Sequence, residues 1–188
     1  MLKCEGMYFY KGKYINLKVL EEKDIYQSNW VGWFNDEYLC QQNTHHYFPN
    51  TIEKQKNFLA SLNTDKKIQL GIIDKKSPAE ICGVISLQDI DLLHRKAEIA
   101  CLSDISLTSS KPEIYLESHI LMIKHAFNQL GLNKIHTGTI NRNVPQAMKR
   151  AFNFEIEGVL KQSIYKNGVF HDAILLAVFA NTVIYPEI

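Results

Sequence analysis

The segment from Glu113 to Leu130 constrains the fold most, because its apolar residues repeat with the period of an α-helix. Gly131 follows it, and a glycine at that place is typical of a helix C-cap. Strand-forming residues occupy 97–102 before the helix and 135–140 after it. A long helix between strands predicts a mixed α/β architecture. The residues that recur at three- and four-residue spacing are Leu116, Ile120, Ile123, Phe127 and Leu130.

The rest of the chain also reads as strands and helices, without an internal repeat, a low-complexity tract or a linker. The strands at 68–73, 81–87 and 97–102 are joined by turn sequences, which predicts an antiparallel meander. We therefore expect residues 1–188 to form one domain of the α/β (α+β) class. The other expected elements are a strand at 14–20, a helix from an Asp24 N-cap to 35, a helix capped by Thr51, a helix at 143–153, and strands at 154–162 and 170–179 around an Asn167-Gly168 turn.

The charge and hydropathy of the chain exclude several kinds of partner. Lys plus Arg total 21 and Asp plus Glu total 20, so the formal net charge is +1. A protein that binds nucleic acid by neutralising phosphates needs a basic excess, so no nucleic-acid partner is expected. No apolar run approaches the roughly 20 residues that span a bilayer, so no membrane association is expected. The segment Met1–Gly6 lacks an apolar signal core, which predicts a cytoplasmic protein.

Metal sites and several common catalytic motifs are missing from the sequence. The four cysteines are scattered without a C-x-x-C pair, and among the seven histidines only His45 and His46 are adjacent. We therefore expect no metal site, and thiols that are unpaired and mostly buried. The chain also lacks a Walker loop, G-x-G-x-x-G and G-x-S-x-G, which removes the usual signals of nucleotide hydrolysis, dinucleotide redox chemistry and hydrolase-type acyl transfer.

Four sequence stretches, found in order along the chain, carry a resemblance to a known family. They are Lys11–Leu17 with Trp30–Asp36, Leu87–Asp91 with Arg95–Ile99, Ala126–Ile135, and Glu157–Lys161 with Tyr165–Gly168 and His171-Asp172. Together they resemble the GNAT superfamily of acyl-CoA-dependent N-acetyltransferases and its RimJ/RimL-like branch in particular. The resemblance implies a mixed, mostly antiparallel sheet of about seven strands flanked by four helices. It also implies an acyltransferase that uses acetyl-CoA as co-substrate and acetylates an amine.

The resemblance also implies where CoA would bind, with its pyrophosphate on the first amides of the central helix. This chain departs from the family there, because 110–115 contains no glycine where the family usually has two small residues. Ser110 and Glu113 instead have the spacing of a capping box. The implied cofactor-binding residues are Cys101, Leu102 and Ser103 on the strand beside pantetheine, Ser109, Ser110 and Lys111 before the helix, and Asn143.

Glu98 is the implied general base, acting on the amine through water. The alternative is a surface strand glutamate that pairs with Lys96 or Arg95. Asn143 has a similar alternative as a simple N-cap. The family often places a proton-donating tyrosine in the helix at 143–153, and this chain has none there, so the general acid stays unassigned.

The acceptor pocket is implied at His45, His46, Tyr47 and Phe48. Either histidine is also a possible base, and ordinary packing of the loop is the alternative. We expect a small-molecule amine acceptor, an amino sugar either free or linked to a nucleotide. The other hypotheses are acetylation of a protein N-terminus and a non-catalytic protein that binds an acyl-CoA or a partner without turnover, the latter because of the glycine-free loop. The protein is expected to be a monomer or homodimer.

Overall fold

The computed structural model describes residues 7–41, 43, 45–103 and 110–188. Its centre is an eight-stranded sheet with the order β1-β2-β3-β4-β5-β6-β8-β7. Neighbouring strands are antiparallel except β5 and β6, which are parallel. The strands are β1 Tyr8–Lys11, β2 Ile15–Val19, β3 Ile68–Asp74, β4 Gly83–Asp91, β5 Lys96–Ser103, β6 Lys134–Thr139, β7 Glu155–Lys166 and β8 Val169–Phe179.

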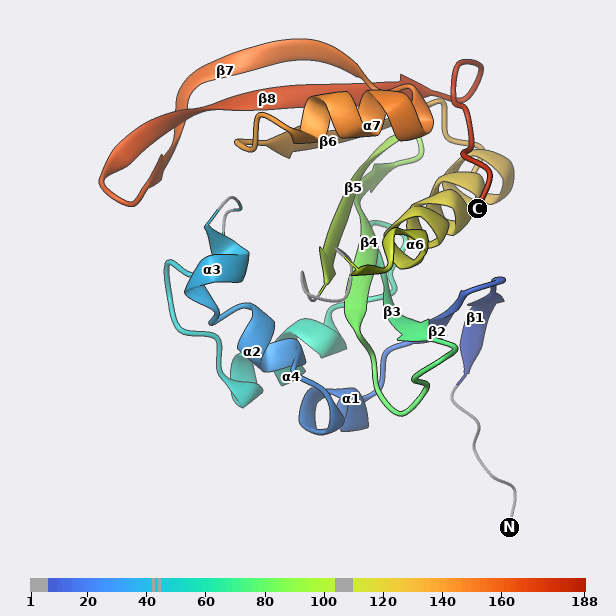
Figure 1. The fold of residues 1–188 in the computed structure, drawn as a ribbon, viewed down its shortest axis with the longest axis vertical. Coiled ribbons are helices and arrows are strands. Elements are labelled where there is room, and N and C mark those ends of the chain that lie inside the picture. The colour runs from blue at the N-terminus through green and yellow to red at the C-terminus, as the bar shows by residue number, and fades with distance from the viewer. Residues whose placement is uncertain (1–6, 42, 44, 104–109) are drawn as a thin grey trace.

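Helices cover the two faces of the β2–β5 part of the sheet, as Figure 1 shows. One face carries α6 (Pro112–Lys124), which continues into the π-helical turn η1 (His125–Gln129). The other face carries the N-terminal helices α1 (Glu22–Gln27), α2 (Trp30–Trp33) and α4 (Ile52–Ala60), and α3 (Glu37–Cys40) follows α2. The last helix, α7 (Val144–Phe152), lies beside β6 and β8.

Alternation along the strands divides the core into two clusters, because successive strand residues point to opposite faces. Leu70, Ile85 and Ile99 pack with the apolar side of α6. On the opposite face, Val84 packs in a second cluster with Trp30 of α2. Burial of each such side chain contributes about 1.5–3 kcal/mol, so both faces are stabilised by helix packing.

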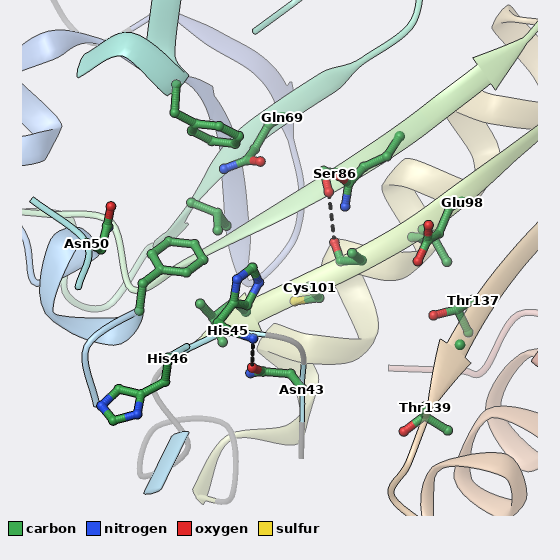
Figure 2. A pocket seen from close by; sticks show the side chains of 18 of the residues that line it. Asn43, His45, His46, Asn50, Gln69, Ser86, Glu98, Cys101, Thr137 and Thr139 are labelled. Atoms are coloured by element: carbon green, nitrogen blue, oxygen red, sulfur yellow. Dashed lines mark hydrogen bonds between the residues drawn. The ribbon is translucent and has the colours of Figure 1, made fainter. Parts of the chain in front are cut away.

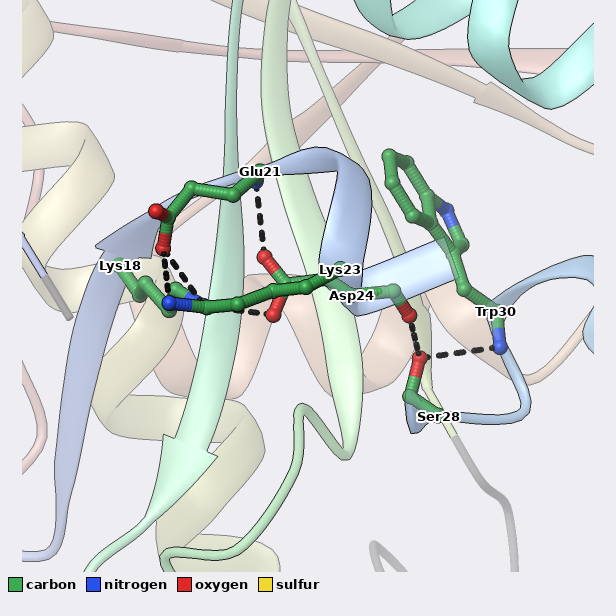
Figure 3. A network of polar contacts seen from close by, with 6 residues as sticks. All are labelled: Lys18, Glu21, Lys23, Asp24, Ser28 and Trp30. Atoms are coloured by element: carbon green, nitrogen blue, oxygen red, sulfur yellow. Dashed lines mark hydrogen bonds and ion pairs between the residues drawn. The ribbon is translucent and has the colours of Figure 1, made fainter. Parts of the chain in front are cut away.

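The expected helix from Asp24 to residue 35 is wrong, because the chain breaks it into α1 and α2. Glu21, not Asp24, is the N-cap, and Asp24 accepts a 2.8 Å hydrogen bond from the Glu21 backbone N–H and pairs with Lys18 at 2.5 Å (Figure 3). Ser28 then adopts extended backbone, and its hydroxyl donates to the Asp24 carbonyl oxygen at 2.6 Å. The Trp30 N–H donates to the same hydroxyl, which starts the next helix.

Two further expectations are corrected and several are confirmed. The sheet has eight strands and not about seven, because β1 adds an edge strand that pairs with β2. The described helices also exceed four, since the N-terminal region forms several short ones. Thr51 caps α4, Gly131 has the positive φ of a C-cap at 64°, and Asn167 and Gly168 have the positive φ angles of a tight turn.

Glu117 joins α6 to the turn between β1 and β2. Its carboxylate is buried, and it accepts backbone N–H groups from Lys13, Tyr14 and Ile15 at 2.5, 2.7 and 2.9 Å. Gly12 allows this approach, because a Cβ there would lie 2.6 Å from the carboxyl carbon. The turn is therefore fixed to the helix by one side chain. None of the helices in the described part of the chain is long and apolar enough to cross a bilayer.

Candidate functional site

The sheet opens between β5 and β6. The two strands pair over only three positions, ending at Glu98 and His136. Beyond that point β5 stays bonded to β4 as far as Ser103, and β6 stays bonded to β8 as far as Thr139. The ribbons of β5 and β6 diverge there (Figure 1). Because strand edges that do not pair expose N–H and C=O groups, this cleft suits an extended ligand that carries amides.

A cavity of about 890 Å³ occupies this opening, and its lining comes from both faces of the sheet. On the face of the N-terminal helices it is lined by Gln69, Ser86 and Gln88. On the other side it reaches Tyr115 of α6 and Met148 of α7. A smaller cavity of about 340 Å³ adjoins it and shares Cys101, Leu102, Tyr115, Thr139 and Val144.

Glu98 lies where the two strands separate, and it lines the large cavity. Across the cleft from it, β6 presents Thr137 and Thr139 (Figure 2). Burial, reinforced by the negative charge of Asp89, raises the pKa of Glu98 above its ordinary value. Arg95, one of the two lysine or arginine partners considered for Glu98, instead donates through Nε to the Gly131 carbonyl oxygen at 2.6 Å. The position and the raised pKa both favour the base hypothesis for Glu98.

The aromatic loop expected at the acceptor pocket does line the cavity, with His45, His46, Tyr47 and Phe48 all contributing. Figure 2 shows His45 and His46 of this loop. Packing also holds the loop, since the His45 ring meets Phe34 edge-on at 4.7 Å. Burial, together with the positive charges of Lys166 and Lys67, lowers the pKa of His45, which favours a neutral imidazole. The two interpretations of this loop, pocket and packing, are therefore compatible.

The tip of the β7–β8 hairpin holds this loop in place. The buried Lys166 ammonium donates to the backbone carbonyl oxygens of Asn43 and His45 at 2.9 and 2.6 Å. It lies 4.9 Å from the centre of the Tyr47 ring, and the Tyr47 hydroxyl donates to the Tyr165 carbonyl oxygen at 2.8 Å. Lys166 is therefore part of the attachment of this loop and not a solvated surface charge.

Three of the expected cofactor-binding residues lie together at the cleft. Cys101 and Leu102 line both cavities, and Ser103 lines the smaller one. Burial raises the pKa of the Cys101 thiol to about 12, so it stays protonated and unreactive near neutral pH.

The start of α6 differs from the expected capping box. The N-cap is Lys111, not Ser110, and Pro112 follows as the first helical residue. Lys111 pairs with the buried carboxylate of Asp74 at 2.6 Å, so its ammonium is already engaged. Ser110 is described immediately before this N-cap, whereas Ser109 lies outside the described residues.

Asn143 occupies the N-cap position of α7, but its side chain makes no capping hydrogen bond. Its backbone N–H donates to the Asn141 side-chain oxygen at 2.9 Å, and the side chain is exposed. The N-cap position expected for Asn143 is therefore confirmed, but its side chain does not cap the helix, and the neighbouring asparagine fixes the turn instead. Asn143 lies next to Val144, which lines both cavities, but does not itself line either.

Sequence reasoning missed Tyr115 and His119 as cleft residues. The Tyr115 hydroxyl makes a weak contact with the Met148 sulfur at 3.7 Å, and burial raises its pKa. His119 contacts the Tyr115 carbonyl oxygen through Nδ1 at 2.9 Å, and the two rings lie 4.0 Å apart. Burial lowers the pKa of His119 to about 4. Their four-residue spacing puts both on one side of α6, which was a usable signal.

The polar residues of β3 and β4 were missed as well. Gln69, Ser86 and Gln88 alternate with apolar residues, so they share the face opposite α6. That alternation was visible in the sequence as polar interruptions of otherwise apolar strands. Across the described residues, no three His, Cys, Asp or Glu side chains are placed to hold a metal ion.

Comparison with known proteins gives a consistent family. The sequence profile of the acetyltransferase (GNAT) domain matches residues 17–175. YdaF of Bacillus subtilis (strain 168), named as a candidate ribosomal N-acetyltransferase, is 30% identical over 95 residues. That alignment covers 50% of this chain and 51% of YdaF, so it spans about half the length of the curated relative.

Solved structures share the fold at low sequence identity. Spermidine N-acetyltransferase from Vibrio cholerae, in complex with CoA and spermine, matches with a TM-score of 0.76 and 17% identity, over 91% of this chain and 98% of that one. RimJ of Mycobacterium smegmatis, in complex with CoA-disulfide, matches with a TM-score of 0.75 and 17% identity, over 89% and 82%. At such identities the likeness shows the fold alone.

Proposed function

Because the chain belongs to the GNAT acetyltransferase family, we propose that it transfers the acetyl group of acetyl-CoA to the primary amine of a small-molecule acceptor. One observation carries the proposal. A single cavity joins the opening between β5 and β6 to the loop at His45–Phe48, with Glu98 at the junction. We also propose that residues 1–188 act as one domain, since one sheet includes strands from Tyr8 to Phe179.

The residues at the cleft fit a CoA arm. The diverging edges of β5 and β6 offer backbone hydrogen-bonding groups to its amides, beside Cys101, Leu102 and Ser103. Acetyl-CoA supplies the activated acetyl thioester when bound. The complexes of the two structural neighbours with CoA and with CoA-disulfide support this co-substrate. The names YdaF and RimJ support a place in or near the RimJ/RimL-like branch.

Glu98 is the proposed general base. An amine is protonated near neutral pH, and its lone pair becomes available only when a base removes a proton. The raised pKa of Glu98 makes its carboxylate a stronger base than an ordinary glutamate. Its place at the junction lets it accept the proton directly or through one water.

Tyr115 is the proposed proton donor to the departing thiolate. Its hydroxyl lies at the cleft and makes only a weak contact with the Met148 sulfur, so its proton is not held by a strong acceptor among the described residues. This role would fill the position left by the absence of a tyrosine in α7.

A small acceptor suits the cavity better than a peptide does. The loop over the cavity is fastened by Lys166 and Tyr47, which favours a fixed pocket for a small molecule over a groove that adapts to a peptide. Lys54 and Lys67 line the cavity and supply positive charge for a phosphate-bearing acceptor. An amino sugar, free or linked to a nucleotide, is the acceptor that this combination favours.

Two other functions have specific support. Acetylation of a protein N-terminus is favoured by the names of YdaF and RimJ. A non-catalytic role, in which the protein binds an acyl-CoA or another partner without turnover, is favoured by the start of α6, where Pro112 lacks an N–H and Lys111 is engaged by Asp74.

Calorimetry with acetyl-CoA, followed by thiol release with amino sugars, their nucleotide derivatives and N-terminal peptides, tests these functions. We expect acetyl-CoA to bind and an amino sugar to release thiol. Glu98→Gln should lower kcat by about 100-fold and remove the acidic limb of the pH–rate profile, while Glu53→Gln, an exposed control on α4, should change neither. Binding of acetyl-CoA without thiol release from any acceptor would favour a non-catalytic acyl-CoA-binding role. Absence of heat at millimolar acetyl-CoA would favour a non-catalytic role with another partner. If Glu98→Gln keeps both the rate and the acidic limb, Glu98 is not the base.

A further inference from the structure

Two glutamine side chains end at the acceptor side of the cavity without a full set of partners. Gln55 of α4 and Gln69 of β3 both line the cavity, and they are only 2% and 5% exposed. Among the described residues, neither amide nitrogen has a hydrogen-bond partner. Buried amide groups are normally paired, because an unpaired one keeps the cost of leaving water. Two such groups at one cavity indicate that something else pairs with them there.

Gln55 is held in place by a chain of amides. The Asn35 side chain makes two hydrogen bonds to the backbone of Asn50, at 2.8 and 2.7 Å. The Asn50 side chain in turn donates to Gln55 Oε1 at 2.8 Å. Because the oxygen of Gln55 is occupied in this way, its nitrogen is the group left for another partner. The side chain is therefore fixed before any ligand arrives.

Gln69 lies on the same face of the sheet as Glu98. It is in register with Ser86 of β4, which is in register with Ala100 of β5. Glu98 is two residues from Ala100 and so points to the same side, as Figure 2 shows for Gln69, Ser86 and Glu98. Two strand spacings and two residues separate the backbones of Gln69 and Glu98 by about 12 Å. Once both side chains reach inward, the space between them suits one small ring.

The charges around the cavity oppose a second ammonium on the acceptor. Among the described residues that line the cavity, Glu98 is the only one with a carboxylate, and Lys54 and Lys67 are the two lysines. The Lys67 ammonium lies 4.4 Å from the centre of the Phe58 ring, and the Lys54 ammonium donates to the Pro49 carbonyl oxygen at 2.8 Å. A diamine that placed one nitrogen at Glu98 would bring its other charge toward these cations without a second carboxylate to meet it.

We propose that Gln55 and Gln69 form an uncharged recognition pair that binds hydroxyl or carbonyl oxygens on the far side of the acceptor from its amine. This inference rests on the proposed function, because it takes the amine to lie at Glu98. It selects aminated polyols of single-ring size and rejects linear diamines. Gln55 and Gln69 are then specificity-determining residues.

The test is calorimetric binding of glucosamine and of 1,4-diaminobutane to the protein saturated with CoA, where no acetyl transfer takes place. We expect glucosamine to bind at least about tenfold more tightly than the diamine. Gln69→Met, which keeps the size but removes the amide, should weaken glucosamine about tenfold. Gln69→Glu should weaken glucosamine and strengthen the diamine, reversing the preference. Gln146→Glu, the same change at an exposed position of α7, should alter neither affinity.

Thermal unfolding of each variant separates loss of binding from loss of fold, and Gln55→Met gives a second measurement if a Gln69 variant unfolds. Equal or reversed affinities in the unaltered protein, affinities that the substitutions leave unchanged, or no binding of either amine would overturn the proposal. Selective glucosamine binding without thiol release from acetyl-CoA would contradict the proposed transfer and leave the recognition pair standing. Thiol release that is faster with the diamine would contradict the recognition pair and leave the proposed acetyl transfer standing.

Discussion

Removal of the Glu117 carboxylate should destabilise the protein by about 3–5 kcal/mol, although Glu117 lies outside the cavity lining. The carboxylate accepts three backbone N–H groups at 2.5, 2.7 and 2.9 Å and is 6% exposed. A hydrogen bond to a charged group contributes about 1.5–3 kcal/mol, and the three are not additive. The Lys13 N–H lies on an exposed turn, so water replaces part of the hydrogen bond that it loses. The Ile15 N–H belongs to a buried residue, so its lost hydrogen bond is not replaced in this way. Glu117→Ala therefore falls in the stated range, and Glu117→Gln, which keeps one acceptor oxygen, should lose about 1–3 kcal/mol.

Urea denaturation followed by tryptophan fluorescence measures this loss, and the midpoint of thermal unfolding should fall by about 10 °C for Glu117→Ala. Glu53→Ala, on an exposed turn of α4, is the matched control and should change stability by less than about 0.5 kcal/mol. A loss below about 1 kcal/mol for Glu117→Ala would refute the reasoning, since water would then satisfy the turn as well as the carboxylate does.

Two other substitutions test the start and the middle of α6. Lys111→Met should lower the free energy of unfolding, measured by urea denaturation, by about 1–3 kcal/mol, because it removes the cation that pairs with the buried Asp74 carboxylate. The affinity for acetyl-CoA should stay within about twofold. A large loss of affinity without a loss of stability would mean that Lys111 binds the cofactor. Burial lowers the pKa of His119 to about 4 in the folded protein, so as pH falls this histidine is protonated in the unfolded chain before it is protonated in the folded one. The stability that is present above about pH 6.5 is therefore lost progressively toward pH 4. At pH 4.5 this loss is about 2–3 kcal/mol, and His119→Asn should abolish that part of the pH dependence in denaturation measured at pH 7 and 4.5; an unchanged slope would contradict the assignment.

Local patterns in the sequence predicted most elements of the fold. The helical stripe that includes Ile120 and Ile123 is buried as expected, and Gly131 ends its segment with the positive φ that glycine permits. These features depend on neighbours within one or two turns, so the sequence alone contains them. The break between α1 and α2 depends instead on the Ser28 hydroxyl, which competes with the helix for backbone partners.

The site was less predictable, because its parts come from distant segments. Glu98 and the loop at 45–48 were expected from a family resemblance, and the structure brings them to one cavity. Tyr115 was missed as a cleft residue, since nothing local shows that α6 faces α7 across the cleft. The role of Lys166 could not be predicted from local sequence, because its carbonyl partners lie more than 120 positions earlier in the chain.

The attachment of Lys166 to main-chain oxygens has a consequence for how the loop can vary. A contact with backbone does not depend on which side chains occupy positions 43 and 45, so this attachment is kept when those residues are replaced. Diversification of the amine range, by natural drift or by a mutant library, can then act on the loop's side chains without detaching it from the hairpin. A library that varies 45–48 and keeps Lys166 should retain far more folded members than one that varies Lys166 itself.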